Sequence, residues 1–403
     1  MDRNQAEKII SDYQTPLYVF DVKELKKRIK YIRNNLPPTV SICYAIKANT
    51  FFLKEICDCV DKFEVCSPGE LSICLEQGLP AEKLVISGVY KTPEVIENLF
   101  IEKHPIGCYT VESLQQFELL RDLSEKYKLY INILLRLTSG NQFGLDDDEA
   151  KKIISDRLKY PYINISGIQY FSGTQKNSIK RLKREIEYLD GFMSDVSDNY
   201  GFCVGELEFG PGFPVSYFQS ESFDEPAFFE EFSKLLLSIN YKTKISLELG
   251  RSIAASCGSY FTSVVDTKTN KEQNYAILDG GIHHITYFGQ FMAMKKPYFE
   301  LFPARSSGEF MDWNLCGSLC TANDILIKQL PVQDLKIGDI IMFENTGAYC
   351  VTEGISLFLS RDLPHVVLLG DDGNTKSVRA PINTYKFNSP NYERNEKNNG
   401  KAY

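Results

Sequence analysis

The segment Ser41-Ile-Cys-Tyr-Ala-Ile-Lys-Ala-Asn49 guides the interpretation of the whole chain. Its first half is apolar and β-prone, which predicts a buried strand, and Lys47 stands where the apolar run ends. A lysine at the mouth of a buried strand is partly desolvated, which lowers its pKa and makes its amine a usable nucleophile toward an aldehyde. The alternative is that Lys47 is a solvated ammonium at a strand end. The segment by itself leaves both interpretations open.

This segment is the first in a series of short apolar runs that alternate with longer helix-like segments. The runs are Ile42–Ala48, Phe63–Cys66, Leu84–Ser87, Gly107–Val111, Leu129–Leu137, Ile165–Ser172, Leu207–Phe213 and Ile245–Arg251. Alternating β and α units predict a parallel sheet, and eight of them suit a (β/α)8 barrel. A doubly wound sheet would alternate in the same way, so periodicity alone does not decide between the two folds.

The regions before and after this series have a different pattern of apolar residues. A short strand (Thr15–Asp21) and a charged helix (Val22 to about Asn35) precede it. After Arg251 the chain has strand-like segments joined by turns, with little helical periodicity: Ser259–Asp266, Asn274–Asp279, Asp324–Lys328, Asp339–Glu344 and His365–Leu369. This pattern predicts a mostly β second domain. The polar tail from about Asn388 has too little apolar content to pack.

The composition limits the classes of function. With 403 residues, a net charge of −8 and 43% apolar residues, the chain is typical of a two-domain soluble protein, without a nucleic-acid surface or a membrane span. Its N-terminus is polar and lacks a signal-peptide core. Eleven scattered cysteines and four histidines do not complete a zinc pattern, so we expect no metal and free thiols in the cytoplasm.

Tyr44-Ala-Ile-Lys-Ala-Asn49 resembles the cofactor-lysine strand of the fold-type III pyridoxal 5'-phosphate (PLP) enzymes. These are the group IV decarboxylases of diaminopimelate, ornithine and arginine and, more distantly, alanine racemase. Later motifs follow in that family's order. The resemblance implies that Lys47 binds PLP in a TIM-like barrel (alanine racemase-like) over residues 28–255. It also implies a mostly β domain, residues 1–27 and 256–387, that completes the active site, and leaves 388–403 as a flexible tail.

Acidic residues in two of the predicted strands are candidates for contact with the cofactor. Glu64 lies in Phe63-Glu-Val-Cys-Ser-Pro-Gly-Glu-Leu71, and a glutamate in a short buried strand is costly unless it is paired. Glu248-Leu-Gly-Arg-Ser252 is similar to the family's Glu-Pro-Gly-Arg motif. PLP accepts electrons well only if its pyridine nitrogen stays protonated, and a carboxylate beside it achieves that. The resemblance implies this role for Glu248.

Glycine-containing strand ends are candidates for phosphate binding, because glycines let backbone N–H groups approach an anion. The resemblance implies a phosphate loop with Gly210 and Gly212, a hydroxyl from Thr174, and Gly250 with Arg251 beside the phosphate. Pro211 lacks an N–H group, so this loop has one donor fewer than a triple-glycine version.

The second domain carries two further motifs. Asn314-Leu-Cys-Gly-Ser-Leu-Cys-Thr-Ala-Asn-Asp324 resembles the family's Gly-Pro-Leu-Cys-Glu segment, whose cysteine delivers a proton after the carboxylate is lost. Cys320 takes that place, although a buried core thiol is the alternative. Asn345-Thr-Gly-Ala-Tyr349 matches the Gly-Ala-Tyr motif and places Tyr349 at the cofactor. In the family these segments cross to the partner's barrel, which implies a homodimer with shared active sites.

Three departures from the family pattern concern the substrate. Phe171 stands where a histidine commonly stacks on the pyridine ring. Thr321 replaces an acid that grips a distal ammonium, and a hydroxyl cannot neutralise that charge. The Arg-Pro-x-Leu-Tyr motif is absent after Asp279-Gly-Gly-Ile-His-His284. His283 and His284 are therefore candidates for substrate binding, or else structural turn residues.

These departures resemble a side branch of the family, the butirosin-pathway type of decarboxylase, whose members act on modified or carrier-protein-linked amino acids. The leading hypothesis is a PLP-dependent carboxy-lyase in specialised biosynthesis, acting on a small-molecule or carrier-linked amino acid. Alternatives are a diaminopimelate- or ornithine-type decarboxylase of a free diamino acid, an amino-acid racemase, or a PLP-binding protein without turnover.

Overall fold

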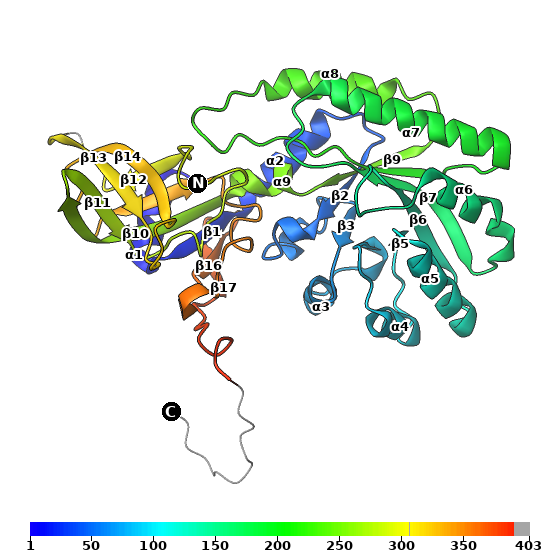
Figure 1. The fold of residues 1–403 in the computed structure, drawn as a ribbon, viewed down its shortest axis with the longest axis horizontal. Coiled ribbons are helices and arrows are strands. Elements are labelled where there is room, and N and C mark those ends of the chain that lie inside the picture. The colour runs from blue at the N-terminus through cyan, green and yellow to red at the C-terminus, as the bar shows by residue number, and fades with distance from the viewer. Residues whose placement is uncertain (306, 391–403) are drawn as a thin grey trace, which may run out of the picture. The chain divides into compact units, whose positions relative to one another are not determined.

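Eight parallel strands close into a barrel in this computed structural model, in the order of the sequence. They are β2 (Ser41–Ala45), β3 (Lys62–Val65), β4 (Leu84–Ile86), β5 (Cys108–Val111), β6 (Ile131–Leu137), β7 (Ile163–Phe171), β8 (Glu206–Gly210) and β9 (Lys244–Leu249). The last strand pairs with the first, with Cys43 opposite Glu248. This closure confirms the predicted (β/α)8 barrel and excludes a doubly wound sheet (Figure 1).

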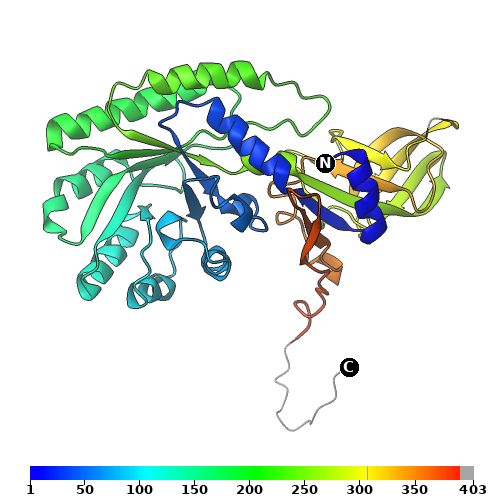
Figure 2. The same ribbon diagram turned by 180° about the vertical axis from the view of Figure 1, so that it is seen from behind.

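Helices surround the barrel strands. They are α2 (Val22–Asn34), α3 (Pro68–Glu76), α4 (Pro93–Ile101), α5 (Leu114–Tyr127), α6 (Asp147–Ser155), α7 (Ile179–Tyr200), α8 (Glu225–Leu237) and the single turn α9 (Arg251–Ala254). Local chemistry sets their ends: the Asp21 carboxylate accepts the N–H of Glu24 at the start of α2, and Gly201 ends α7 with φ +57°. Figures 1 and 2 show α7 and α8 side by side outside the barrel.

The structure describes residues 1–305 and 307–390, which form two compact units. The barrel unit comprises Asp21–Gly258 together with Gly347–Tyr349, and the β unit comprises Met1–Phe20, Ser259–Thr346 and the described residues from Cys350 onward. Most of the predicted flexible tail, residues 391–403, lies outside the described residues. Within the described ranges, no helix has the length and apolar character needed to cross a membrane.

The β unit contains one nine-stranded sheet, which confirms the predicted mostly β second domain. Its strands are β1 (Leu17–Asp21), β10 (Gly258–Asn270), β11 (Gln273–Leu278), β12 (Phe299–Phe302), β13 (Phe310–Cys316), β14 (Ile325–Gln333), β15 (Ile340–Glu344), β16 (His365–Leu369) and β17 (Thr375–Arg379). The main path runs β14-β13-β11-β10-β1-β16-β17, and β15 joins β10 to β12. The sequence interpretation missed β12, β13, β17 and the helix α1 (Arg3–Asp12).

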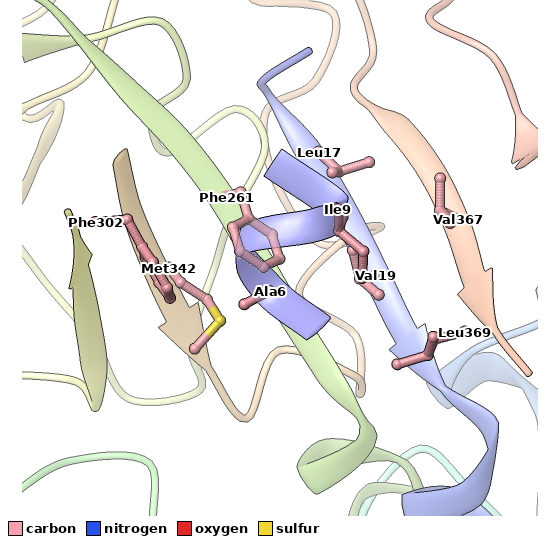
Figure 3. Close-up of a cluster of buried hydrophobic side chains, with 9 residues drawn as sticks. All are labelled: Ala6, Ile9, Leu17, Val19, Phe261, Phe302, Met342, Val367 and Leu369. Carbon is pink, nitrogen blue, oxygen red and sulfur yellow. The ribbon is translucent and has the colours of Figure 1, made fainter. Parts of the chain in front are cut away.

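The core of the β unit lies where α1 packs on the sheet. Figure 3 shows the buried side chains of this cluster: Ala6, Ile9, Leu17, Val19, Phe261, Phe302, Met342, Val367 and Leu369. They come from one helix and from strands far apart in the sequence. Strands β1 and β16 are neighbours in the sheet, although they lie near opposite ends of the sequence. Both bury side chains in this cluster under α1, which holds the two ends of the chain in one domain.

Candidate active site

Lys47 lies between two glutamates at the C-terminal mouth of the barrel. Strand β2 ends at Ala45, and Lys47 follows in a short 3₁₀ turn (Ile46–Ala48), so it lies just beyond the strand rather than at its end. Its Nζ donates to Glu64 Oε2 at 2.5 Å and to Glu248 Oε1 at 3.3 Å. Glu64 is on β3 and Glu248 is on β9, the two strands that pair with β2. Barrel closure therefore places one carboxylate on each side of the lysine.

The predicted lowering of the Lys47 pKa is wrong. Burial does lower the pKa of this amine, but the carboxylates of Glu64 and Glu248 raise it by more, and the result lies well above the usual value. Desolvation can be expected from the Lys47 segment alone, whereas the neighbouring charges come from β3 and β9. In this arrangement Lys47 is an ammonium, and its amine becomes nucleophilic only when a proton leaves the cluster.

The two glutamates differ in their affinity for a proton. Their side chains are only 3% and 5% exposed, so burial raises the pKa of each. For Glu64 the Lys47 ammonium outweighs burial and lowers the pKa to about 2. For Glu248, burial and the charge of Glu64 raise the pKa to about 7. Glu64, which lies closer to the Lys47 ammonium, therefore has the lower affinity for a proton, and Glu248 has the higher.

The ends of β7 and β8 form two adjoining loops. Gly212 has φ +61°, and a Cβ there would lie 2.1 Å from the carbonyl oxygen of Gly173, so only glycine fits. The N–H of Lys176 donates to the Gly212 carbonyl at 2.8 Å and joins the loops. A Cβ on Gly210 would lie 2.4 Å from the ring of Phe171, which ends β7. The backbone at Gly210 and Gly212 therefore lies so close to the end of β7 that no side chain fits between them.

Arg251, at the start of α9, connects this loop region to a segment far along the chain. Its Nη1 donates to the Tyr217 hydroxyl at 2.9 Å and its Nε donates to Thr174 Oγ1 at 3.3 Å. The guanidinium lies 4.4 Å from the centre of the Tyr349 ring. A Cβ on Gly250 would lie 3.1 Å from the Tyr349 hydroxyl. A cation, three hydroxyls and glycine backbone thus meet in one cradle.

Tyr349 belongs to the barrel unit, although the surrounding sequence is part of the β unit. Its N–H donates to the Ala48 carbonyl at 2.7 Å, directly after Lys47, and its φ of +65° is unusual for a residue with a side chain. Burial raises the pKa of its phenol to about 12, so the hydroxyl keeps its proton at neutral pH. A backbone held in this conformation beside the lysine is typical of a functional site.

The structure thus brings together all the cofactor residues expected from the sequence, within the barrel unit. They are Lys47, Glu64, Phe171, Thr174, Gly210, Gly212, Glu248, Gly250, Arg251 and Tyr349. The four remaining candidates, Cys320, Thr321, His283 and His284, lie in the β unit. Cys320 is exposed on the loop between β13 and β14, not buried in a core. That loop is fixed by Asp324, whose carboxylate accepts the N–H of Leu319 and of Ile282, each at 2.8 Å.

The two histidines are buried, and their rings lie 3.8 Å apart. His284 is fully bonded, with Nδ1 at 3.0 Å from the Tyr260 hydroxyl and Nε2 at 2.7 Å from the Asp362 carbonyl. Neither ring nitrogen of His283 has a hydrogen-bond partner in the part of the chain that the structure describes. Burial lowers the pKa of His283 to about 3 and of His284 to about 4, so both are neutral at pH 7. The contacts of His284 match the structural alternative, and substrate binding by His283 stays a prediction.

Polar side chains deeper in the barrel were missed by the sequence interpretation. Gln169 on β7 donates from Nε2 to Glu248 Oε2 at 3.0 Å. Glu208 on β8 is fully buried, and Arg136 on β6 pairs with Glu112 at 2.9 Å. Gln169, Glu208 and Arg136 each have apolar residues on both sides in the sequence, as in Leu207-Glu208-Phe209. The high cost of burying such residues was the signal that could have identified them.

Comparisons with known proteins agree on one family. Residues 22–260 match the model "Pyridoxal-dependent decarboxylase, pyridoxal binding domain". The L-glutamyl-[BtrI acyl-carrier protein] decarboxylase of Niallia circulans is 24% identical over 94% of each chain. The diaminopimelate decarboxylase of Bacteroides thetaiotaomicron is 26% identical, over 83% of this chain and 91% of its own. The solved diaminopimelate decarboxylase of M. jannaschii with L-lysine shares the fold, with a TM-score of 0.82 at 21% identity, over 93% of this chain and 92% of that one.

The residues at the barrel mouth fit PLP. A lysine amine can bond its aldehyde, and a buried carboxylate that exchanges a proton near neutrality can pair with its pyridine nitrogen. The cradle of Gly212, Thr174 and Arg251 combines a backbone that tolerates no side chain with a hydroxyl and a cation, which suits a phosphate.

Proposed function

Because the chain belongs to the pyridoxal-dependent decarboxylases, we propose that it removes the α-carboxylate of an amino acid or amino-acyl derivative at the mouth of the barrel. The main observation that supports this proposal is the position of Lys47 between Glu64 and Glu248. The free thiols of the chain also support a cytoplasmic location.

Each residue has a proposed role in this reaction. Bound PLP supplies an electron sink for the pair of electrons that the departing carboxylate leaves behind. Lys47 would hold the aldehyde of the cofactor, Glu64 would stabilise positive charge on the Lys47 amine, and Glu248 would keep the pyridine nitrogen protonated. The phosphate would be bound by Gly210, Gly212, Thr174, Gly250, Arg251 and Tyr349. Phe171 would pack on the pyridine ring. Cys320 of a second copy of the chain would supply the proton that takes the place of the lost carboxylate on the substrate carbon.

We propose that the substrate has a neutral, amide or thioester-linked distal end, and a glutamyl group on a carrier protein is one candidate. The carrier-protein relative and Thr321 both support this choice. The diaminopimelate decarboxylases among the relatives favour the second candidate, a free diamino acid with two charged ends. The racemase and non-catalytic alternatives receive no such support, since the family and these relatives are decarboxylases.

Glu248→Gln should lower kcat roughly 10²–10³-fold while PLP still binds, because a neutral amide cannot keep the pyridine nitrogen protonated in the transition state. The measurement is carbon dioxide release, together with cofactor content by absorbance. Glu230→Gln, an exposed acid on α8, is the matched control and should behave as the unmodified protein does. Near-normal turnover of Glu248→Gln would remove Glu248 from the mechanism.

Lys47→Ala and Cys320→Ala should each be inactive alone and partly active when mixed, if two copies share each site. Random exchange makes about half of the dimers hybrid, each with one intact site, so recovery should approach about a quarter of full activity. Mixing Lys47→Ala with Glu248→Ala is the control, since both changes lie in the same barrel and no complete site can form. Absence of recovery in verified hybrids would mean that one chain builds each site.

A further inference from the structure

A polar column runs through the barrel behind Glu248, where TIM barrels normally pack layers of apolar side chains. Three neighbouring strands contribute to it: β7 with Gln169, β8 with Glu208 and β9 with Glu248. Gln169 lies opposite Glu208, and Glu208 lies opposite Ser246, two residues before Glu248. Glu208 is therefore one layer deeper in the barrel than Glu248.

The side-chain amide of Gln169 is the hydrogen-bond donor to both glutamates of this column. Gln169 Nε2 donates to Glu248 Oε2 at 3.0 Å and lies 3.5 Å from Glu208 Oε1. Gln169 Oε1 and Glu208 Oε2 have no hydrogen-bond partner within residues 1–305 and 307–390. Both atoms are acceptors when Glu208 is ionised, and each unpaired buried acceptor is costly. A proton on Glu208 turns one of them into a donor.

The surroundings of Glu208 also favour a proton. Lys62 on β3 forms an ion pair with Glu208 Oε2 at 3.8 Å, but its ammonium donates its hydrogen bond to Glu206. Burial raises the pKa of Glu208 to about 8. The positive charge of Lys62 opposes this rise, and the negative charges of Glu248 and Glu206 add to it. The titratable groups that face it from its own strand and from β2, β3, β5 and β9 are Cys43, Lys62, Glu64, Cys108, Glu206 and Glu248.

We propose that Glu208 carries a proton and that, together with Gln169, it forms a positioning pair that keeps Glu248 ionised and oriented toward the pyridine nitrogen of PLP. This inference rests on the role proposed for Glu248. The amide N–H of Gln169 stabilises the charged form of Glu248, and a neutral Glu208 adds no negative charge behind it. Ionised Glu208 would draw the proton shared by Glu248 and the pyridine nitrogen toward Glu248. Glu208 and Gln169 touch neither substrate nor cofactor in this proposal.

The test follows the protonation of the pyridine nitrogen by ¹⁵N NMR in holoenzyme loaded with ¹⁵N-labelled PLP. In the unmodified protein the protonated fraction should fall as the pH rises through about 8. Glu208→Gln, which mimics the protonated acid, should keep the nitrogen protonated over that range. Gln169→Leu should lower the protonated fraction at pH 7 and reduce kcat about tenfold with little change in KM, the loss of one hydrogen bond to a charged group.

Thermal unfolding of the holoenzyme gives a readout independent of catalysis. A carboxyl whose pKa is raised by folding favours the folded state at low pH, and this stability is lost as the pH rises toward the folded pKa. Glu208→Gln should not lose this stability at high pH, because its amide does not titrate. Its Tm should exceed that of the unmodified protein at pH 9, and the difference should shrink on acidification to pH 5. Glu225→Gln, an acid paired with Arg28 outside the barrel, is the control.

The outcomes separate this inference from the proposed function. If Glu248→Gln leaves the nitrogen signal unchanged, the role of Glu248 itself is wrong. If Glu248→Gln alters the signal but Glu208→Gln and Gln169→Leu do not, the positioning pair is overturned and the role of Glu248 stands. If Gln169→Leu does not fold, Gln169→Glu replaces it, because a second carboxylate should lower the protonated fraction further.

Discussion

Lys47→Arg should lower decarboxylation by on the order of 10⁴–10⁶-fold, which is the scale of losing a covalent catalytic residue. Arginine preserves the positive charge between Glu64 and Glu248, so the carboxylates stay paired and the barrel should remain folded. Its guanidinium cannot bond the cofactor aldehyde. The absorbance of covalently bound PLP should therefore vanish, and borohydride reduction followed by peptide mapping should label position 47 only in the unmodified protein.

Lys47→Ala is the companion variant, because it removes both the bond to the cofactor and the charge. It should be as inactive as Lys47→Arg and less stable, since two buried carboxylates lose their counter-ion. A matched change of another buried lysine, Lys91→Arg, should leave the borohydride label at position 47. Recovery of a borohydride label on any other lysine of an active Lys47→Arg protein would overturn the assignment.

The eight parallel strands could be predicted because they are buried on both faces and read as continuous apolar runs, whereas their closure into a barrel was implied only by the family resemblance. Ile133, Leu134 and Leu135 of β6, for example, are all fully buried. Strands β13 and β17 have exposed residues and mixed composition, such as Asp312 in β13 and Lys376 in β17, so no apolar period identified them. Helix α1 has only two buried residues, Ala6 and Ile9, and its ten-residue pattern was too short to detect.

The candidate site could be predicted as a set of residues but not as a set of charges. The strand-end motifs that carry Lys47, Glu64 and Glu248 are visible in the sequence. The direction of the Lys47 pKa is not, because it depends on carboxylates that lie 17 and 201 residues away along the chain. Glu208 was missed for a similar reason: its partners Gln169 and Lys62 come from other strands, and its neighbours in sequence, Leu207 and Phe209, suggest only core packing.

The identity of the substrate depends on which acids are free to bind a distal ammonium. Glu64 is committed to Lys47, and Asp324 is 2% exposed with its carboxylate bonded to two backbone N–H groups. Neither is therefore available to replace the acid that the family resemblance implies at the position of Thr321. Thr321 itself is partly exposed, and its hydroxyl carries no charge. A substrate with a distal ammonium would have to bury that charge against a neutral partner, which costs several kcal/mol.

Ornithine, lysine and meso-diaminopimelate should therefore be poor substrates, with kcat/KM about a thousandfold or more below that of a neutral-ended substrate such as a glutamyl thioester. Thr321→Glu should raise kcat/KM for the three diamino acids at least about tenfold, and Thr321→Gln, which has the same size without the charge, should not. Carbon dioxide release measured over this panel with the three proteins tests charge separately from shape. Efficient decarboxylation of any diamino acid by the unmodified protein would show that the acid is supplied elsewhere and that the substrate is a diamino acid. An equal gain from Thr321→Gln would show that side-chain size, and not charge, limits the reaction at this position.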